Sequence, residues 1–124
     1  HTRDHADLPT LDDAALQAQL AGARHDLEAL LGEPVDYLAY PYGRYDERVL
    51  RQARHAGYRA AFSVQPGFNR PDVDRFRLRR LDVFGTDTPA MLRRKITLGS
   101  NDGRLTAALR YNADRALTRL GIRH

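Results

Sequence analysis

The feature that most constrains the fold is an apolar run, a turn, a helix and a second apolar run, all within residues 35–64. The first run, 35–40, lacks strict alternation, which indicates a strand buried on both faces. It stops at Pro-Tyr-Gly, a sequence typical of a tight turn. A helix over about 46–56 and a strand over 58–64 follow, so we expect a right-handed parallel crossover. The sequence therefore predicts an α/β fold.

A long amphipathic helix is predicted before this unit, over about 12–31, with acidic residues in its first turn and Gly32 after its last. Its apolar residues recur at three- and four-residue spacing, which predicts one buried stripe. The stripe comprises Leu16, Leu20, Ala23, Leu27, Leu30 and Leu31.

Three further elements are predicted after this unit: a strand over 76–84, a helix over about 88–98 and a helix over about 104–120. Thr88 and Pro89 are typical residues for a helix start. Met91, Leu92 and Ile96 are expected to point inward. Of the pair Arg79-Arg80 in the strand, one side chain is expected to point inward and to need a carboxylate partner.

Three parallel strands form a thin sheet for so many apolar helix faces, so we expect further strands upstream or from a partner chain. Residues 1–124 are accordingly interpreted as a single partial domain, in which 85–124 form a helical extension.

The composition excludes some functions. The net charge is +4, but the basic residues are spread along the chain and are not interleaved with aromatic residues, so nucleic-acid binding is not expected. No apolar run approaches the roughly 20 residues of a membrane span, and no apolar leader is visible. The absence of cysteine excludes disulfides and leaves the compartment open.

His1 and His5 are the strongest candidates for metal ligands. A spacing of four lets two imidazoles face one ion if the segment is helical or tightly turned, and imidazole is a common ligand of transition metals. A hydrolytic site also needs a third ligand and an open position for water. Asp4 and Asp7 lie nearby, although such carboxylates more often orient a ligand than bind metal. A frayed chain end is the alternative interpretation.

The Pro-Tyr-Gly turn has two interpretations. It is either a plain turn or a device that directs the backbone N–H of Tyr42 toward a developing oxyanion. The other histidines carry less information: His25 and His55 are expected to be solvated on helices, and His124 is terminal.

Several motifs in order resemble the polysaccharide deacetylases, the family-four carbohydrate esterases with a NodB-homology domain. Members carry a His-Ser/Thr-x-x-His motif, which is matched by residues 1–5, HTRDH. A helix and a strand ending in Pro-Tyr/Phe-Gly follow in the family, matched by Pro41-Tyr42-Gly43. The strand AGYRAAF, residues 56–62, and the stretch 78–83 also resemble family strands, so the resemblance covers about residues 1–84.

The resemblance implies a distorted (β/α) barrel that hydrolyses the N-acetyl groups of a glycan, with zinc or another divalent metal such as nickel, cobalt or iron. By this resemblance His1 and His5 are metal ligands, and the backbone N–H of Tyr42 is the oxyanion donor. Pro41 fixes the catalytic turn, and Tyr40 and Gly43 contact the substrate. An N-acetylated polysaccharide of the cell envelope, periplasmic or secreted, is the implied partner.

The departures from the family pattern are also informative. Members carry an Asp-Asp motif upstream of the histidine pair, with a general base and a third ligand, and this chain does not contain it. Ala39 replaces a frequent Arg, which resembles the branch that acts on exported poly-N-acetylglucosamine. The late Leu-x-x-His motif, which provides the general acid, is not evident. We therefore interpret the chain as the C-terminal part of a deacetylase domain, weak or inactive without its N-terminal portion.

Two other functions remain open at the level of sequence. The chain could be a non-catalytic glycan- or partner-binding module that keeps a deacetylase-like fold. It could also hold copper through the amine and imidazole of His1 with a second histidine, although the helix-rich pattern argues against the β-sandwich on which such sites are built.

Overall fold

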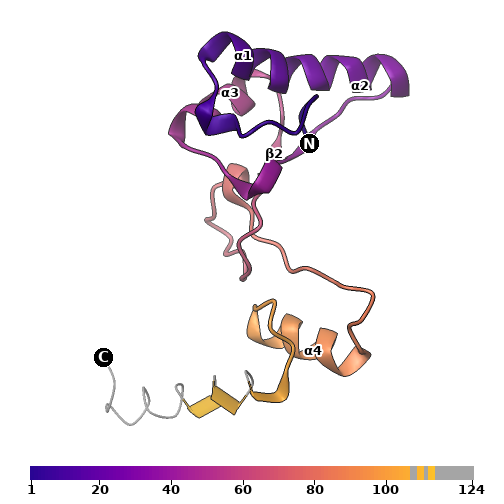
Figure 1. The fold of residues 1–124 in the computed structure, drawn as a ribbon, viewed down its shortest axis with the longest axis vertical. Helices are drawn as coiled ribbons and strands as arrows, with labels where there is room; N and C mark the ends of the chain where they lie inside the picture. Colours follow the sequence, from indigo (N-terminus) through magenta and orange to yellow (C-terminus); the bar gives the residue numbers. More distant parts are fainter. Residues whose placement is uncertain (107–108, 111, 114–124) are drawn as a thin grey trace. The chain divides into compact units, whose positions relative to one another are not determined.

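The protein is described by a computed structural model covering residues 1–106, 109–110 and 112–113 (Figure 1). These residues form two compact units. The first comprises residues 1–65 and 69–80, and the second comprises 66–68 and the described residues from 81 onward. Among the described residues, none of the helices is both long and apolar enough to cross a membrane.

The first unit begins with a short 3-10 helix, Leu8–Thr10, and then a long helical segment that Figure 1 shows as one rod. This rod consists of α1 (Asp13–Gln17), a π-helical turn η2 (Ala18–Gly22) and α2 (Ala23–Leu31). The Asp12 carboxylate caps it by accepting the Ala15 N–H at 2.8 Å. The predicted helix over 12–31 is confirmed, whereas the π-turn was not predicted.

A parallel crossover follows the rod, as predicted, although both strands are shorter than expected. Strand β1 (Tyr37–Ala39) leads through the turn at 41–43 to helix α3 (Glu47–His55) and strand β2 (Ala60–Phe62). The strands pair in parallel, Tyr37 opposite Ala60 and Ala39 opposite Phe62. Helix α3 begins where the Asp46 side chain accepts the Val49 N–H at 2.8 Å.

The predicted strand over 76–84 is wrong. Arg75–Arg77 form a 3-10 turn, and pairing with the sheet is limited to one parallel bridge between Phe62 and Leu78. The Leu78 N–H donates to the Ala61 carbonyl at 3.0 Å, and the Leu78 carbonyl accepts the Ser63 N–H at 2.8 Å.

Beyond this bridge a side chain supplies the hydrogen bonds at Arg79, and the Arg80 N–H donates to the Gln65 carbonyl at 3.2 Å. The Asn69 amide donates to the Arg79 carbonyl at 2.8 Å and accepts the Arg79 N–H at 2.9 Å. The next residue, Arg80, is the half-buried member of the arginine pair, while Arg79 is exposed. The buried Nε of Arg80 has no hydrogen-bond partner within the described part of the chain, so the predicted carboxylate partner is not found there.

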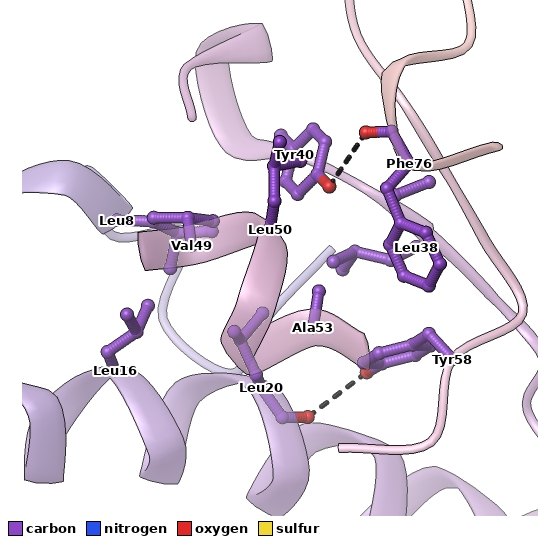
Figure 2. Close-up of a cluster of buried hydrophobic side chains, with 11 residues drawn as sticks. Leu8, Leu16, Leu20, Leu38, Tyr40, Val49, Leu50, Ala53, Tyr58 and Phe76 are labelled. Atoms are coloured by element: carbon purple, nitrogen blue, oxygen red, sulfur yellow. Dashed lines mark hydrogen bonds between the residues drawn. The ribbon is translucent and has the colours of Figure 1, made fainter. Parts of the chain in front are cut away.

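The hydrophobic core of the first unit lies between the helical rod, α3 and the two strands (Figure 2). Two buried tyrosines bind backbone carbonyls inside it: the Tyr40 hydroxyl donates to Phe76 at 2.9 Å and the Tyr58 hydroxyl to Leu20 at 3.1 Å. Its buried residues are Leu8, Leu16, Leu20, Leu38, Tyr40, Val49, Leu50, Ala53, Tyr58, Ala61 and Phe76.

The predicted apolar stripe of the rod is buried only in its first part. Leu16 and Leu20 are fully buried, but Leu27, Leu30 and Leu31 are 39%, 81% and 61% exposed. The apolar side chains in the last turns of α2 are therefore outside the core cluster of this unit.

The second unit contains α4 (Pro89–Leu98), which Thr88 caps and Gly99 ends, as the sequence predicts. Its buried residue is Lys95, 1% exposed. The Lys95 ammonium donates to the Asp87 carboxylate at 2.6 Å and the Asp82 carbonyl at 3.0 Å, and it lies 4.7 Å from the centre of the Phe84 ring.

The expectation that α4 buries Met91, Leu92 and Ile96 is therefore wrong, because the residue that α4 buries is Lys95. Ile96 is 57% exposed, and Met91 and Leu92 are only half-buried. Residues 105–106, 109–110 and 112–113 are helical, and Arg104 forms a bend before them. The other residues of the helix predicted over 104–120 lie outside the described residues, as does His124.

Candidate active site

The N-terminal segment returns to the end of β1, where His1 contacts the last strand residue. The Nδ1 atom of His1 lies 2.7 Å from the Ala39 carbonyl oxygen. A carbonyl oxygen can only accept, so Nδ1 carries the hydrogen and Nε2 keeps its lone pair. Metal-binding histidines are commonly oriented by such a bond from the second ring nitrogen to a backbone carbonyl.

His5 lies between His1 and the turn that follows β1. Its ring centre is 4.6 Å from that of His1 and 4.5 Å from that of Tyr42, which it meets edge-on at 76°. All three side chains are exposed. The structure thus brings together both predicted metal ligands and the predicted oxyanion donor, from segments about 40 residues apart in the sequence.

Backbone strain accompanies this arrangement. Among the described residues, those other than glycine with positive φ are Thr2 (60°), His5 (55°) and Tyr42 (57°). A left-handed conformation costs an L-residue roughly 1–2 kcal/mol. Such residues concentrate at binding and catalytic sites, because the surrounding structure must hold them there. All three belong to the two segments that meet at this site.

The Pro-Tyr-Gly turn leaves one backbone donor unused. The Gly43 N–H donates to the Tyr40 carbonyl at 2.9 Å and the Arg44 N–H donates to the Pro41 carbonyl at 3.1 Å. The Tyr42 N–H makes no hydrogen bond to any residue that the structure describes. An uncommitted N–H in a fixed turn is the kind of group that stabilises an oxyanion.

Gly43 fixes this turn against the chain that follows β2. It has φ of 67°, and a Cβ there would lie 2.3 Å from Val64 Cγ2 and 2.7 Å from the Val64 backbone nitrogen. Only a residue without a side chain fits between the turn and this backbone.

Tyr40 does not occupy the place predicted for it. Its side chain is fully buried, and its hydroxyl is bound to Phe76 (Figure 2). In this position it supports the turn from the core, in place of the predicted substrate contact. Pro41 is also buried, whereas Gly43 is half-buried.

The nearby carboxylates each bind another side chain. The Asp7 carboxylate binds the Arg44 guanidinium at 2.5 Å, and the Asp4 carboxylate accepts from the Gln19 amide at 2.5 Å. Within the described part of the chain, no group of three or more acidic, histidine or cysteine side chains could hold a metal ion. His1 and His5 offer two nitrogen donors of the kind that binds a divalent metal, and the bond to Ala39 orients the ring of His1.

The copper alternative fits this geometry poorly. A chelate from the amine and the ring of one histidine uses Nδ1, the ring nitrogen nearer to the backbone. In His1 that nitrogen donates to Ala39. His25 and His55, predicted to be solvated, are both exposed on helices.

Sequence reasoning missed the residues that hold the N-terminal segment in place. Gln19 and Asp26 on the helical rod bind residues 3 and 4 between the two histidines. Exposed or half-exposed polar residues on an amphipathic helix are normally solvated, so the sequence carried no signal for this role.

Comparison with known proteins agrees with this geometry. Residues 1–61 match the model of the family "Polysaccharide deacetylase". YxkH of Bacillus subtilis, assigned by its name to the polysaccharide deacetylases, is 29% identical over 83 residues, which are 67% of this chain and 30% of that protein.

Solved structures of two deacetylases are also similar. A polysaccharide deacetylase from Bacillus cereus is 32% identical with a TM-score of 0.56, covering 64% of this chain and 25% of its own. The Streptococcus pyogenes deacetylase PplD, solved with acetate, is 22% identical, and its TM-score of 0.71 over 76% of this chain and 42% of its own shows a common fold.

The family match covers the same segments that form the candidate site. The chain spans less than half the length of each of these three relatives. Through residues 1–61, which contain the histidine pair and the Pro-Tyr-Gly turn, the chain belongs to the polysaccharide deacetylase family.

Proposed function

We propose that the chain is part of a metal-dependent N-deacetylase acting on a glycan of the cell envelope. The observation that carries this proposal is the contact of the His5 ring with the rings of His1 and Tyr42, together with a Tyr42 N–H that has no hydrogen-bond partner among the described residues. Two imidazoles supply part of the donor set for a divalent ion, and a free backbone N–H is the kind of group that stabilises the oxyanion formed in amide hydrolysis. Family membership supports the same reaction class.

Each residue has a defined role in this proposal. His1 and His5 hold a divalent metal, zinc first, with nickel, cobalt or iron as alternatives; when bound, this ion supplies Lewis acidity and an activated water. The Tyr42 N–H donates to the developing oxyanion. Pro41 and Gly43 keep the turn rigid, so that this N–H needs no reorganisation during the reaction.

The general base, the general acid and the third ligand are proposed to come from residues outside this chain, as part of a complete (β/α) barrel. Two observations support this. The described residues offer no third ligand beside the pair, and the buried Nε of Arg80 lacks a partner among them. A carboxylate from another strand would satisfy that group. An exported N-acetylglucosamine polymer is the proposed substrate, which places the protein in the envelope or outside the cell.

A non-catalytic glycan-binding module is the second candidate. The same lack of a third metal-binding side chain among the described residues favours it. It predicts that the full polypeptide binds an N-acetylated glycan and releases no acetate.

The test is acetate release from N-acetylglucosamine oligosaccharides by the full polypeptide, together with its metal content. We expect His1→Ala and His5→Ala to lose both the metal and more than 100-fold of the activity. His25→Ala and His55→Ala are the matched controls, because these exposed histidines lie outside the site. Full activity in the His1→Ala, His5→Ala double variant contradicts the metal assignment, and glycan binding without any acetate release favours the second candidate.

A further inference from the structure

The segment between the two histidines is clamped by a single side chain. Gln19 Oε1 accepts the backbone N–H of Arg3 at 3.2 Å and of Asp4 at 3.1 Å, and Gln19 Nε2 donates to the Asp4 carboxylate at 2.5 Å. One amide thus binds two successive backbone donors and the side chain of the second. No other side chain of the described residues accepts from the backbone of residues 1–5.

Gln19 lies in the π-turn η2, which interrupts the helical rod between α1 and α2. A π-turn is rare, and it alters the direction in which side chains leave the helix. Here the turn is held from the core side, where the buried Tyr58 hydroxyl donates to the Leu20 carbonyl at 3.1 Å. The backbone of η2, which carries Gln19, is therefore held by Tyr58, a residue of the core.

The same turn accommodates Arg3 closely. A Cβ on Gly22 would lie 2.8 Å from Arg3 Cζ, so the guanidinium packs directly on the glycine. Arg3 Nε donates to the Asp26 carboxylate at 2.7 Å one turn further along. Gln19, Gly22 and Asp26 together form the surface on which the segment from His1 to His5 lies.

We infer that the π-turn is a positioning device for the two metal ligands, with Gln19 as its principal positioning residue. The separation of the His1 and His5 rings depends on the backbone between them, which Gln19 holds at Arg3 and Asp4. Thr2 and His5 are in the left-handed region, and the Gln19 hydrogen bonds offset the cost of that conformation. This inference rests on the proposed role of His1 and His5 as metal ligands.

The first test compares Gln19→Ala with Gln17→Ala in the full polypeptide. Gln17 is an exposed glutamine on the same rod and makes no side-chain hydrogen bond to the described residues, so its replacement is the matched control. In the metal-free protein we expect the NOE between the His1 and His5 rings to be lost only in Gln19→Ala. Zinc affinity, measured against a chelator, is expected to fall by about 10–100-fold, as for other residues that orient metal ligands.

The second test reverses the polarity of the clamp. Gln19→Glu keeps an acceptor for the two N–H groups but places a carboxylate against Asp4, so zinc affinity is expected to fall. Adding Asp4→Asn restores a donor opposite the new carboxylate, and we expect the Gln19→Glu, Asp4→Asn variant to regain the NOE and at least ten-fold of the lost affinity. A residue that only stabilises the fold would not show this rescue.

The outcomes separate this inference from the proposed function. If the wild-type polypeptide binds zinc through His1 and His5, but Gln19→Ala matches Gln17→Ala in NOE and zinc affinity, the positioning role is wrong and the metal site stands. If the wild type binds no zinc, the proposed function fails, and loss of the NOE in Gln19→Ala would then show only that Gln19 orders the segment. A Gln19→Ala protein that is unfolded leaves the decision to the polarity reversal.

Discussion

His1 and Ala39 are joined by a hydrogen bond of 2.7 Å between the imidazole Nδ1 and the backbone carbonyl oxygen. This bond fixes the tautomer of the ring, because the carbonyl can only accept. It also attaches the N-terminal segment to the last residue of β1, directly before the Pro-Tyr-Gly turn. The backbone oxygen of Ala39 therefore determines which ring nitrogen of His1 is free to bind the proposed metal.

The tautomer of His1 is the first prediction. In the metal-free protein, at a pH where imidazole is neutral, we expect the hydrogen of His1 to reside on Nδ1. Nitrogen–proton correlation spectra of the ring measure this directly. His55, an exposed helix residue without a hydrogen bond to the described residues, is the control and is expected to show a mixture of tautomers. A hydrogen on Nε2 of His1 would contradict the prediction, because Nδ1 could then not donate to the Ala39 carbonyl and orient the ring.

The second prediction concerns the turn at Gly43. Gly43→Ala is expected to lower the free energy of unfolding by at least about 2 kcal/mol, because strain at φ of 67° adds to a clash with the Val64 backbone. Gly32→Ala is the control: its φ is 70°, but nothing lies within 4 Å of the new Cβ, so only about 1 kcal/mol is expected. Urea unfolding followed by circular dichroism compares them. Equal losses would show that the packing of the turn against Val64 is unimportant.

The third prediction uses the buried hydroxyl of Tyr40. Tyr40→Phe leaves the Phe76 carbonyl without its donor and is expected to destabilise the protein by about 1–3 kcal/mol. Tyr37→Phe, at a residue 63% exposed, is expected to change stability little. Thermal unfolding measures both. Indistinguishable melting temperatures for the two variants would contradict the proposed support of the turn from the core.

Tyr40 also predicts how stability changes at alkaline pH. Burial raises the pKa of Tyr40 well above its ordinary value, and the neighbouring Tyr45 adds to this shift. A pKa higher in the folded than in the unfolded state gives stability that is present below about pH 10 and declines above it. The decline is expected to be shallower in Tyr40→Phe than in the wild type, in urea titrations from pH 9 to 11. Parallel curves would rule out the buried phenol as its source.

The fourth prediction concerns the ion pair beneath α4. The Lys95 ammonium donates to the Asp87 carboxylate and lowers its pKa, and the Phe84 N–H contributes a smaller part. This contribution to stability is present above about pH 4 and is lost as the pH falls through the depressed folded pKa. Asp87→Asn is therefore expected to destabilise α4 at neutral pH and to weaken its acid dependence.

Amide hydrogen exchange in α4, measured between pH 3 and 7, tests this ion pair. Asp72→Asn is the control, because Asp72 is exposed and forms no ion pair with the described residues. The prediction fails if α4 of Asp87→Asn keeps both the protection and the acid dependence of the wild type.

The sequence predicted correctly the helices and the crossover that are marked by capping residues or by apolar periodicity. Thr88 caps α4 as expected, α3 lies within the predicted range of about 46–56, and the crossover from β1 to β2 is parallel. The strand over 76–84 could not be predicted correctly, because the partner of its backbone at Arg79 is the Asn69 side chain. No local pattern shows that an amide ten residues away will supply the hydrogen bonds of a strand.

Part of the candidate site could be predicted from local motifs, and part could not. The spacing of His1 and His5 and the Pro-Tyr-Gly motif identified the segments that the structure brings together. The burial of Tyr40 depends on Phe76, and the clamp of Gln19 depends on a π-turn, which has no sequence signature. The roles of Tyr40 and Gln19 both depend on contacts between segments far apart in the sequence. The periodicity of residues within one helix or strand carries no information about such contacts.

The His1–Ala39 bond spans 38 residues of chain, and the Arg44–Asp7 pair spans 37. Contacts of such separation form after local helices, because a large loop must be closed first. The histidine pair and the turn can meet only once the rod and the crossover have docked. An ion that reaches the chain before this step would find two separate imidazoles and no preformed pocket, so we expect loading of the proposed metal site to follow folding and not to guide it.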